Sequence, residues 1–197
     1  YSFKWIDDFS AARNAAFDRA TMDYILWLDA DDIILPEDLQ KLKALKESLD
    51  PEIDSVTMIY NIAFDEQGRV TFCYRRNRLV KASRHFRWRE PVHEYLEVIG
   101  RTLDSDICVT HKKEKPRPPG RNLKIYEKLL AKGVELSARG TYYYARELKD
   151  NERYEEAVTM FTRFLDSGLG WVEDNIRACG ELARCHLALK DDKSALN

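Results

Sequence analysis

A short apolar run that ends abruptly in acidic residues sets the strongest limit on the fold of this chain. Residues 24–28 read Tyr-Ile-Leu-Trp-Leu, and residues 29–32 read Asp-Ala-Asp-Asp. A run this short and this apolar is typical of a strand buried on both faces, as in a parallel sheet. Residues 36–49 open with Pro-Glu-Asp and then show helical apolar spacing, which predicts an amphipathic helix. The opening of the chain therefore predicts part of an α/β layer fold.

The flanking sequence predicts further elements and a domain boundary. Residues 1–5 suggest the end of a strand and residues 10–20 a helix. From 54 to 111 the pattern is β-rich, and the predicted strands are 55–64, 70–80, 92–99 and 103–110, with a hairpin turn at 65–68. The proline-rich segment 115–120 breaks this pattern. We expect residues 1–115 to form one domain and residues 121–197 another.

After residue 120 the chain predicts helices only. The segments are 121–136, 141–149, 154–165 and 174–189. Tyr154-Glu155-Glu156-Ala157 followed by Phe161 resembles the second helix of a tetratricopeptide repeat. The chain is expected to stop inside a further helix, which would leave the face of Leu182, Cys185 and Leu189 uncovered. That face is then expected to fray or to pair with a second copy of the chain as a homodimer.

Composition excludes some classes of function. The formal net charge of −2 gives no general electrostatic argument for binding nucleic acid. Residues 75–89 are rich in Arg and aromatic residues. Three interpretations stay open: an RNA-binding surface, a binding site for diphosphate or an anionic acceptor, and a solvated strand face. No apolar run approaches the roughly 18 residues of a membrane helix, no signal peptide opens the chain, and no CxxC pair occurs among the four cysteines. We expect the protein to reside in the cytoplasm, where it could also lie at the inner face of the membrane.

The three carboxylates after the apolar run suggest a metal site. Ligands bind at the carboxyl ends of strands in open α/β sheets. Asp29, Asp31 and Asp32 would repel one another there, and Mg²⁺ or Mn²⁺ would neutralise them while leaving positions open for phosphate. The alternative is an acidic loop that only caps the helix after it.

Three segments together resemble family 2 glycosyltransferases of the GT-A type. They are Trp5-Ile6-Asp7-Asp8-Phe9-Ser10-Ala11-Ala12-Arg13-Asn14, Trp27-Leu28-Asp29-Ala30-Asp31-Asp32 and Leu35-Pro36. The match is to the subgroup of lipopolysaccharide-core glucosyltransferases and bacterial peptide S-glycosyltransferases, and it spans residues 5 to about 121. The resemblance implies a Rossmann-like nucleotide-diphospho-sugar domain whose opening units are absent here. It also implies that Asp29 and Asp31, with Asp32 beside them, contact the donor ribose and the metal, and that Arg13 and Asn14 line the nucleotide site.

A second cluster supplies candidate bases. Glu90, His93 and Glu94 lie in Arg-Glu-Pro-Val-His-Glu, and His111 follows a predicted strand. The family shows a Val-His-Glu and a later lone His in this order. In an inverting transfer a carboxylate or His takes the acceptor proton, so Glu94, Glu90 and His93 are the candidates. His111 is a candidate metal ligand or a candidate hydrogen-bond donor to phosphate. The alternative for His93 and His111 is a structural role as a hydrogen-bonded residue.

These observations favour an enzyme over two other classes. The expected reaction moves a hexose, with inversion, from a nucleotide-diphosphate sugar to a hydroxyl or thiol of a glycan, a lipid-linked glycan or a peptide. The alternative is a non-catalytic interaction module that uses the helical repeats. A peptide-binding scaffold has no need for clustered aspartates at a strand end, and the net charge argues against nucleic acid.

Overall fold

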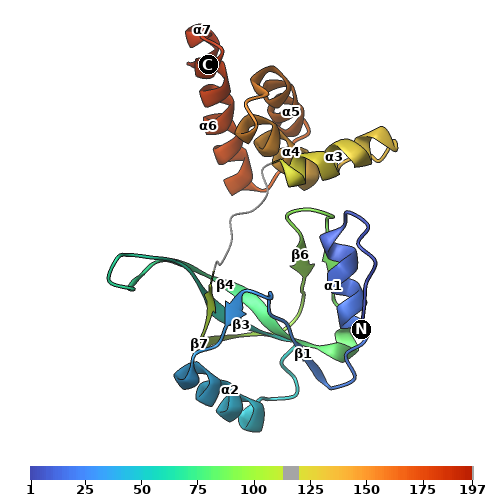
Figure 1. Cartoon of the computed structure of the whole chain (residues 1–197), viewed down its shortest axis with the longest axis vertical. Coiled ribbons are helices and arrows are strands. Elements are labelled where there is room, and N and C mark those ends of the chain that lie inside the picture. Colours follow the sequence, from blue (N-terminus) through green and yellow to red (C-terminus); the bar gives the residue numbers. More distant parts are fainter. Residues whose placement is uncertain (113–119, 197) are drawn as a thin grey trace. The chain divides into compact units, whose positions relative to one another are not determined.

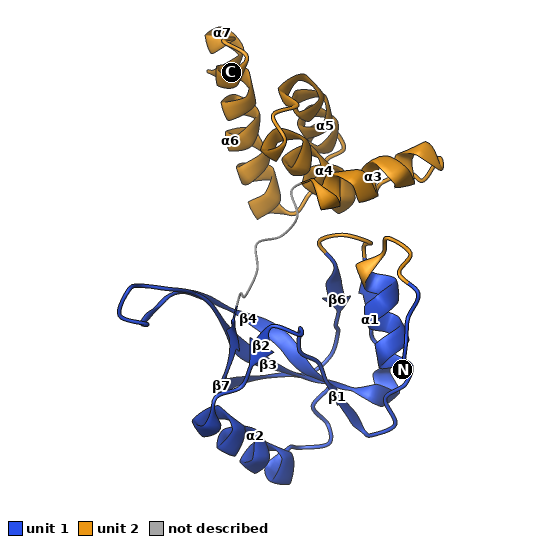
Figure 2. Ribbon diagram, in the orientation of Figure 1, with its two compact units in different colours: residues 1–4, 10–89, 94–116 blue, residues 5–9, 90–93, 117–197 orange. Residues whose placement is uncertain are grey.

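A computed structural model describes residues 1–112 and 120–196, which form two compact units (Figure 2). Unit 1 comprises residues 1–4, 10–89 and 94–116, and unit 2 comprises residues 5–9, 90–93 and 117–197. Two short segments from the first half of the chain thus belong to the second unit. The predicted boundary segment 115–120 lies, apart from Gly120, outside the described residues.

Unit 1 is built on a curled mixed sheet (Figure 1). Its described strands lie in the order β1-β4-β3-β7-β2, with β3 parallel to β7 and the other neighbours antiparallel. The strands are β1 (Tyr24–Leu26), β2 (Asp32–Ile33), β3 (Ser55–Phe64), β4 (Val70–Lys81) and β7 (Thr102–His111). A two-stranded ribbon, β5 (Arg87–Arg89) with β6 (Tyr95–Glu97), follows the short 3₁₀ helix η1 (Ala82–Arg84). The predicted β3–β4 hairpin is confirmed.

The prediction that residues 24–28 form a strand buried on both faces, as in a parallel sheet, is wrong for the described chain. β1 lies at one end of the strand order and pairs antiparallel with β4. Trp27 is buried, whereas Leu26 and Leu28 are 38% and 39% exposed. The run is apolar throughout, yet its side chains still alternate between the core and solvent. Residues 1–5, predicted as the end of a strand, form no regular element.

Two helices of unit 1 pack separate clusters. The helix α2 (Pro36–Ser48) opens with Pro at its first turn and acids beside it, and places Leu42 and Leu45 against Met58 and other residues of β3 and β7. The helix α1 (Phe9–Phe17) buries Phe17 against Trp27 and Trp88. Trp27, which precedes the acidic turn, is thereby held in the cluster of α1.

Unit 2 is helical, as predicted after residue 120. Its helices are α3 (Arg121–Ala131), α4 (Ala138–Asp150), α5 (Tyr154–Asp166), α6 (Val172–Ala188) and α7 (Asp192–Ala195). Tyr126, Ala157 and Phe161 are fully buried in its core, and Val92 joins them from the segment 90–93. Within the described chain, every helix is too short or too polar to cross a bilayer.

The predicted uncovered face on α6 is wrong. Cys185 is fully buried, and Leu182 packs against the same core cluster. The exposed apolar residues of α6 are instead Val172, Ile176 and Leu187. Because Leu182 and Cys185 belong to the core cluster that the helices of unit 2 share, this side of α6 is covered within the chain. The argument for a homodimer through Leu182, Cys185 and Leu189 therefore loses its basis.

We expect Phe161→Ala to destabilise unit 2 by about 3–5 kcal/mol, because it opens a cavity in a core with no room to collapse. Leu169→Ala is the control, since Leu169 is 79% exposed and should change stability by about 0.5 kcal/mol or less. Urea unfolding followed by circular dichroism measures both values. Equal stability of the two variants would contradict this packing.

Candidate active site

The acidic residues form a tight turn at the end of β1. The Asp32 amide donates to the Asp29 carbonyl at 3.0 Å, and the Asp29 amide donates to Asp32 Oδ2 at 3.0 Å. Trp27, just before the turn, is held by its indole N–H, which donates to the Asn77 carbonyl at 2.7 Å. The turn is thus closed on itself and tied to β4, so its carboxylates have defined partners.

Arg13 links Asp29 to Glu94. Its Nη2 lies 2.5 Å from Asp29 Oδ1, and its Nε lies 2.8 Å from Glu94 Oε1. The guanidinium also stacks over the rings of Trp88 and Trp27 at 4.5 and 5.2 Å. Burial alone would lower the pKa of Arg13, but the charges of Asp29 and Glu94 outweigh it and raise the pKa. Three residues predicted from separate motifs therefore meet in one partly buried group.

Asn14, the neighbour of Arg13, has a structural role in this arrangement. Its Nδ2 donates to the Trp88 carbonyl at 3.0 Å, and its Oδ1 accepts from the Trp88 amide at 2.9 Å. The nitrogen and the oxygen of the Asn14 side chain thus both form hydrogen bonds with the backbone of one residue of β5. Asn14 fixes α1 against β5 and in this way holds Arg13 in place.

Asp32 is a buried anchor. Its side chain is fully buried and forms an ion pair with Arg78, which is also fully buried, at 2.8 Å. Tyr60 donates its hydroxyl to Asp32 Oδ1 at 2.8 Å, and burial together with this bond raises the pKa of the phenol. Arg78 in turn lies over the rings of Trp27 and Tyr60 at 4.1 and 4.4 Å. These contacts fix one carboxylate of the turn.

Asp31, Asp32 and His111 form a candidate metal centre. One ligand atom from each lies within 4.8 Å of the others. His111 Nδ1 is 3.7 Å from Asp31 Oδ1 and 3.6 Å from Asp32 Oδ1, too long for hydrogen bonds, and it has no hydrogen-bond partner in the described part of the chain. Ligands about 2.1 Å from a Mg²⁺ ion stand roughly 3 to 4 Å apart. The spacing and the donor types therefore fit a small divalent cation. Asp29 is not in this group, because it faces Arg13.

Glu90 and His93 belong to unit 2 and have partners there. Glu90 accepts from the Ser137 hydroxyl at 2.6 Å, and Ser137 caps the start of α4. His93 lies 2.8 Å from Glu147 and stacks on Tyr143 at 4.1 Å. Burial would raise the pKa of Glu147, but the hydrogen bonds from His93 and Asn122 outweigh it and lower the pKa. Of the three candidate bases, Glu94 is the one in the Arg13 group.

The basic stretch is largely paired with acids. Arg78, Arg84, Arg87 and Arg89 pair with Asp32, Asp54, Asp18 and Glu97. Arg76 differs from them: its guanidinium lies over Trp27 at 4.8 Å and Tyr60 at 5.8 Å, with no ion pair to any described carboxylate. Arg75 and Lys81 also form no ion pair with a described carboxylate, but each donates to a backbone carbonyl, of Ser105 and Pro51. Arg76 instead adds its positive charge next to Trp27, just before the acidic turn.

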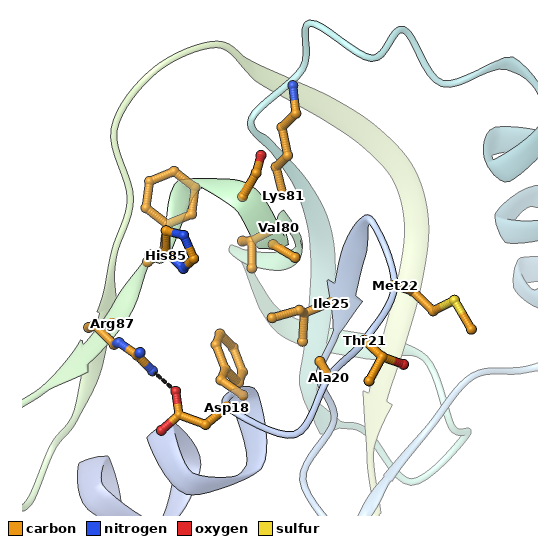
Figure 3. Close-up of a pocket in the computed structure, with 13 residues that line it drawn as sticks. Asp18, Ala20, Thr21, Met22, Ile25, Val80, Lys81, His85 and Arg87 are labelled. Carbon is orange, nitrogen blue, oxygen red and sulfur yellow. Dashed lines mark hydrogen bonds and ion pairs between the residues drawn. The ribbon is translucent and has the colours of Figure 1, made fainter.

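A cavity of about 480 Å³ lies elsewhere in unit 1 (Figure 3). Its lining comes from the end of α1, the start of β1 and the end of β4, and Arg87 and Asp18 form an ion pair at its rim. None of the predicted site residues lines it. The acidic turn follows the other end of β1, so this cavity is separate from the candidate site.

Part of the chain is similar to known proteins. Residues 3–94 match the family model for glycosyl transferase family 2, and this match supports a family 2 glycosyltransferase. A TPR repeat-containing protein of Synechococcus elongatus is 37% identical over 94 residues, which are 47% of this chain and 22% of that protein. The chain thus spans about a fifth of that relative's length. An α/β unit with a curled mixed sheet, followed by helices, is consistent with a partial GT-A domain and a helical segment.

Sequence reasoning did not identify the residues that support the site. Tyr60 lies in a strand of ordinary β pattern, and Arg78 and Trp88 were noted only as part of the basic stretch 75–89, without their roles of holding Asp32 and Arg13. The one available signal was Arg78 between Asn77 and Leu79, at a position that a regular strand facing a core would fill with an apolar residue.

We expect Asp32→Asn to lower the free energy of unfolding by about 3–5 kcal/mol, because it leaves the buried charge of Arg78 without its partner. Asp31→Asn is the matched control, since the Asp31 side chain is 45% exposed and should change stability by about 0.5 kcal/mol or less. Urea unfolding measures both. A stable Asp32→Asn variant would remove Asp32 from its role as anchor.

Proposed function

We propose that the chain is part of an inverting, metal-dependent glycosyltransferase. It would move a hexose from a nucleotide-diphosphate sugar to an acceptor hydroxyl or thiol. The observation on which this depends is the meeting of Arg13, Asp29 and Glu94 beside the Asp31–Asp32–His111 group. The family match over residues 3–94 supports the reading of this place as the transfer site.

In this proposal Asp31, Asp32 and His111 hold Mg²⁺ or Mn²⁺. The cation supplies Lewis-acid stabilisation of the departing diphosphate. Asp32 keeps one oxygen on Tyr60 and the other on Arg78, so Asp31 and His111 are the freer ligands. Arg76 forms no ion pair with a described carboxylate. In this proposal its positive charge also stabilises the negative charge of the departing diphosphate.

Asp29 and Arg13 are assigned to the donor. Asp29 is the first carboxylate after β1, and carboxylates at this position accept hydrogen bonds from ribose hydroxyls in nucleotide-binding sheets. Arg13 holds it through a 2.5 Å contact and is itself fixed by two tryptophan rings. Asn14 contributes indirectly, because it positions α1 through the Trp88 backbone.

Glu94 is assigned as the general base. In a single displacement the acceptor oxygen or sulfur bonds to the anomeric carbon and its proton passes to the base. The bond from that carbon to the diphosphate breaks, and its electron pair leaves with the diphosphate. Glu94 Oε1 pairs with Arg13, which places this carboxylate in the group that includes Asp29, whereas Glu90 and His93 belong to unit 2 and pair there with Ser137 and Glu147. They are the second choices.

The helical unit supports a second candidate function, a protein-interaction module. The relative named above is a TPR repeat-containing protein, and unit 2 here consists of packed helices. We assign residues 121–197 to this module and residues 1–115 to the transferase domain, with segments 5–9 and 90–93 packed into the helical unit. A module without enzymatic activity would not bind metal at the acidic turn, so the metal experiment distinguishes the two.

Mn²⁺ should bind to this chain, and Asp31→Ala should weaken the affinity about tenfold or more, because it removes a charged oxygen ligand. Isothermal titration measures the affinity directly. Asp106→Ala is the control, because Asp106 is an exposed carboxylate of β7 that pairs with Lys41 of α2. Equal affinity of the Asp31 variant and wild type would refute the metal assignment.

In a transferase that contains this chain, Glu94→Gln should lower kcat by roughly 10²–10⁴-fold, since an amide cannot accept the proton. Donor binding should stay nearly unchanged. Glu90→Gln should have a smaller effect on kcat, because Glu90 faces Ser137. If Glu90→Gln abolishes turnover while Glu94→Gln does not, the two assignments must be exchanged.

A further inference from the structure

An aromatic row extends from the candidate site along the β3–β4 hairpin. Tyr60, which donates to Asp32, lies 5.9 Å from the His111 ring and 5.7 Å from the Tyr74 ring. Phe72 follows at 6.2 Å from Tyr74. Tyr60 and Tyr74 are directly opposite in the antiparallel register, so their side chains share one face of the sheet. We call Tyr60, Tyr74 and Phe72 the hairpin row.

The hairpin row becomes more exposed with distance from the acidic turn. Tyr60 is 5% exposed, Tyr74 is 42% exposed and Phe72 is 57% exposed. The pairing of β3 with β7 ends at Asn61 and Thr110, whereas β3 and β4 stay paired to Phe64 and Val70. The outer part of the hairpin is thus a two-stranded ribbon, and its turn lies well away from the other strands (Figure 1).

Solvent-facing ribbons usually have polar side chains, so neighbouring exposed aromatic rings need a reason. The opposite face of the same strand has Thr71, Cys73 and Arg75, which is the ordinary composition for solvent. The aromatic side therefore differs from its own reverse side. Its inner end reaches the group to which we assign the metal.

We propose that the hairpin row is an acceptor subsite for an oligosaccharide. This inference rests on the proposed transferase function. A pyranose ring has a face of C–H bonds, and that face packs on the electron-rich face of an aromatic ring. The two exposed rings, Tyr74 and Phe72, lie 6.2 Å apart, which is of the order of the separation between neighbouring sugars in a glycan chain.

Three features favour a glycan over an apolar peptide or a lipid surface. The exposed pair, Tyr74 and Phe72, is aromatic, and the Tyr74 hydroxyl can exchange hydrogen bonds with sugar hydroxyls. Arg76, on the same strand face next to Tyr74, adds five N–H donors for sugar oxygens. The row also joins the transfer site directly, so a sugar chain lying on it would direct one end toward Asp31 and Glu94.

The test measures glycan binding without the donor or the reaction. The full 197-residue chain, fluorescently labelled, is applied to a microarray of neutral and acidic oligosaccharides. Wild type should bind a subset of them. Phe72→Ala and Tyr74→Ala should each lose about tenfold or more in affinity, because each removes one stacking face. Cys73→Ser, which lies between them on the opposite face, should bind as wild type does.

A leucine variant separates stacking from general apolar contact. Phe72→Leu keeps an apolar surface but has no aromatic face, so glycan binding should fall as it does in Phe72→Ala. If Phe72→Leu binds glycans as well as wild type, or if wild type binds none, the proposal is overturned. Binding of wild type to vesicles of phosphatidylglycerol and phosphatidylethanolamine in place of glycans, kept by Phe72→Leu, would overturn it in favour of a lipid surface.

Mn²⁺ titration of the same variants distinguishes this inference from the proposed function. Phe72→Ala and Tyr74→Ala should bind Mn²⁺ like wild type, because neither residue belongs to the metal group. Loss of glycan binding with normal Mn²⁺ affinity supports the subsite. Glycan binding by a chain that binds no Mn²⁺ would refute the metal assignment and leave the row as a sugar-binding surface.

Discussion

The buried ion pair between Asp32 and Arg78 is the contact on which the rest of the site depends. A fully buried carboxylate and guanidinium are stable only if each has a close partner and their remaining polar atoms are accommodated. Tyr60 and the Asp29 amide complete the partners of Asp32. Arg78 uses Nη1 for the ion pair, whereas its Nε and Nη2 have no hydrogen-bond partner in the described chain and the guanidinium lies against the rings of Trp27 and Tyr60. Because Asp32 comes from the turn and Arg78 from β4, the pair fixes where the turn lies. The Asp29 side chain then contacts Arg13, and the Asp31 side chain faces His111.

The division of the molecule follows packing and not sequence order. Segments 5–9 and 90–93 occur within the stretch that matches the transferase family, yet they pack with the helical unit. Val92 is buried in that core, the Phe9 amide donates to the Pro91 carbonyl, and Glu90 and His93 have left-handed backbone angles of 68° and 54°. Strained backbone of this kind persists only where surrounding contacts determine it. The Ser137, Glu147 and Tyr143 contacts provide them.

Much of the secondary structure could be predicted from the sequence, because it depends on the spacing of apolar and turn-forming residues that are close together in the chain. The β3–β4 hairpin follows from two β-rich runs around a Gly-containing turn, and α3 to α6 follow from helical spacing. Strand neighbours depend on distant pairing instead. The run at 24–28 was predicted to be buried on both faces because its residues are apolar, yet in the described chain it pairs on one side only, antiparallel with β4. The face of Leu182 and Cys185 was expected to be uncovered for the same reason: which side of α6 packs into the core is a tertiary property.

The candidate site shows a more general limit, because adjacent residues divide structural and chemical roles. Asp32 anchors the turn while Asp31 faces His111; Asn14 binds the Trp88 backbone while Arg13 binds Asp29 and Glu94. His93 pairs with Glu147 in the helical unit, whereas Glu94, the next residue, pairs with Arg13. Neighbouring side chains in extended chain or tight turns point in different directions, so one of each pair is directed inward. A motif identifies such a pair without saying which member is which. The distinction needs the partners: both oxygens of Asp32 are held by Tyr60 and Arg78, so its loss should destabilise the fold, whereas the more exposed Asp31 should not be needed for folding.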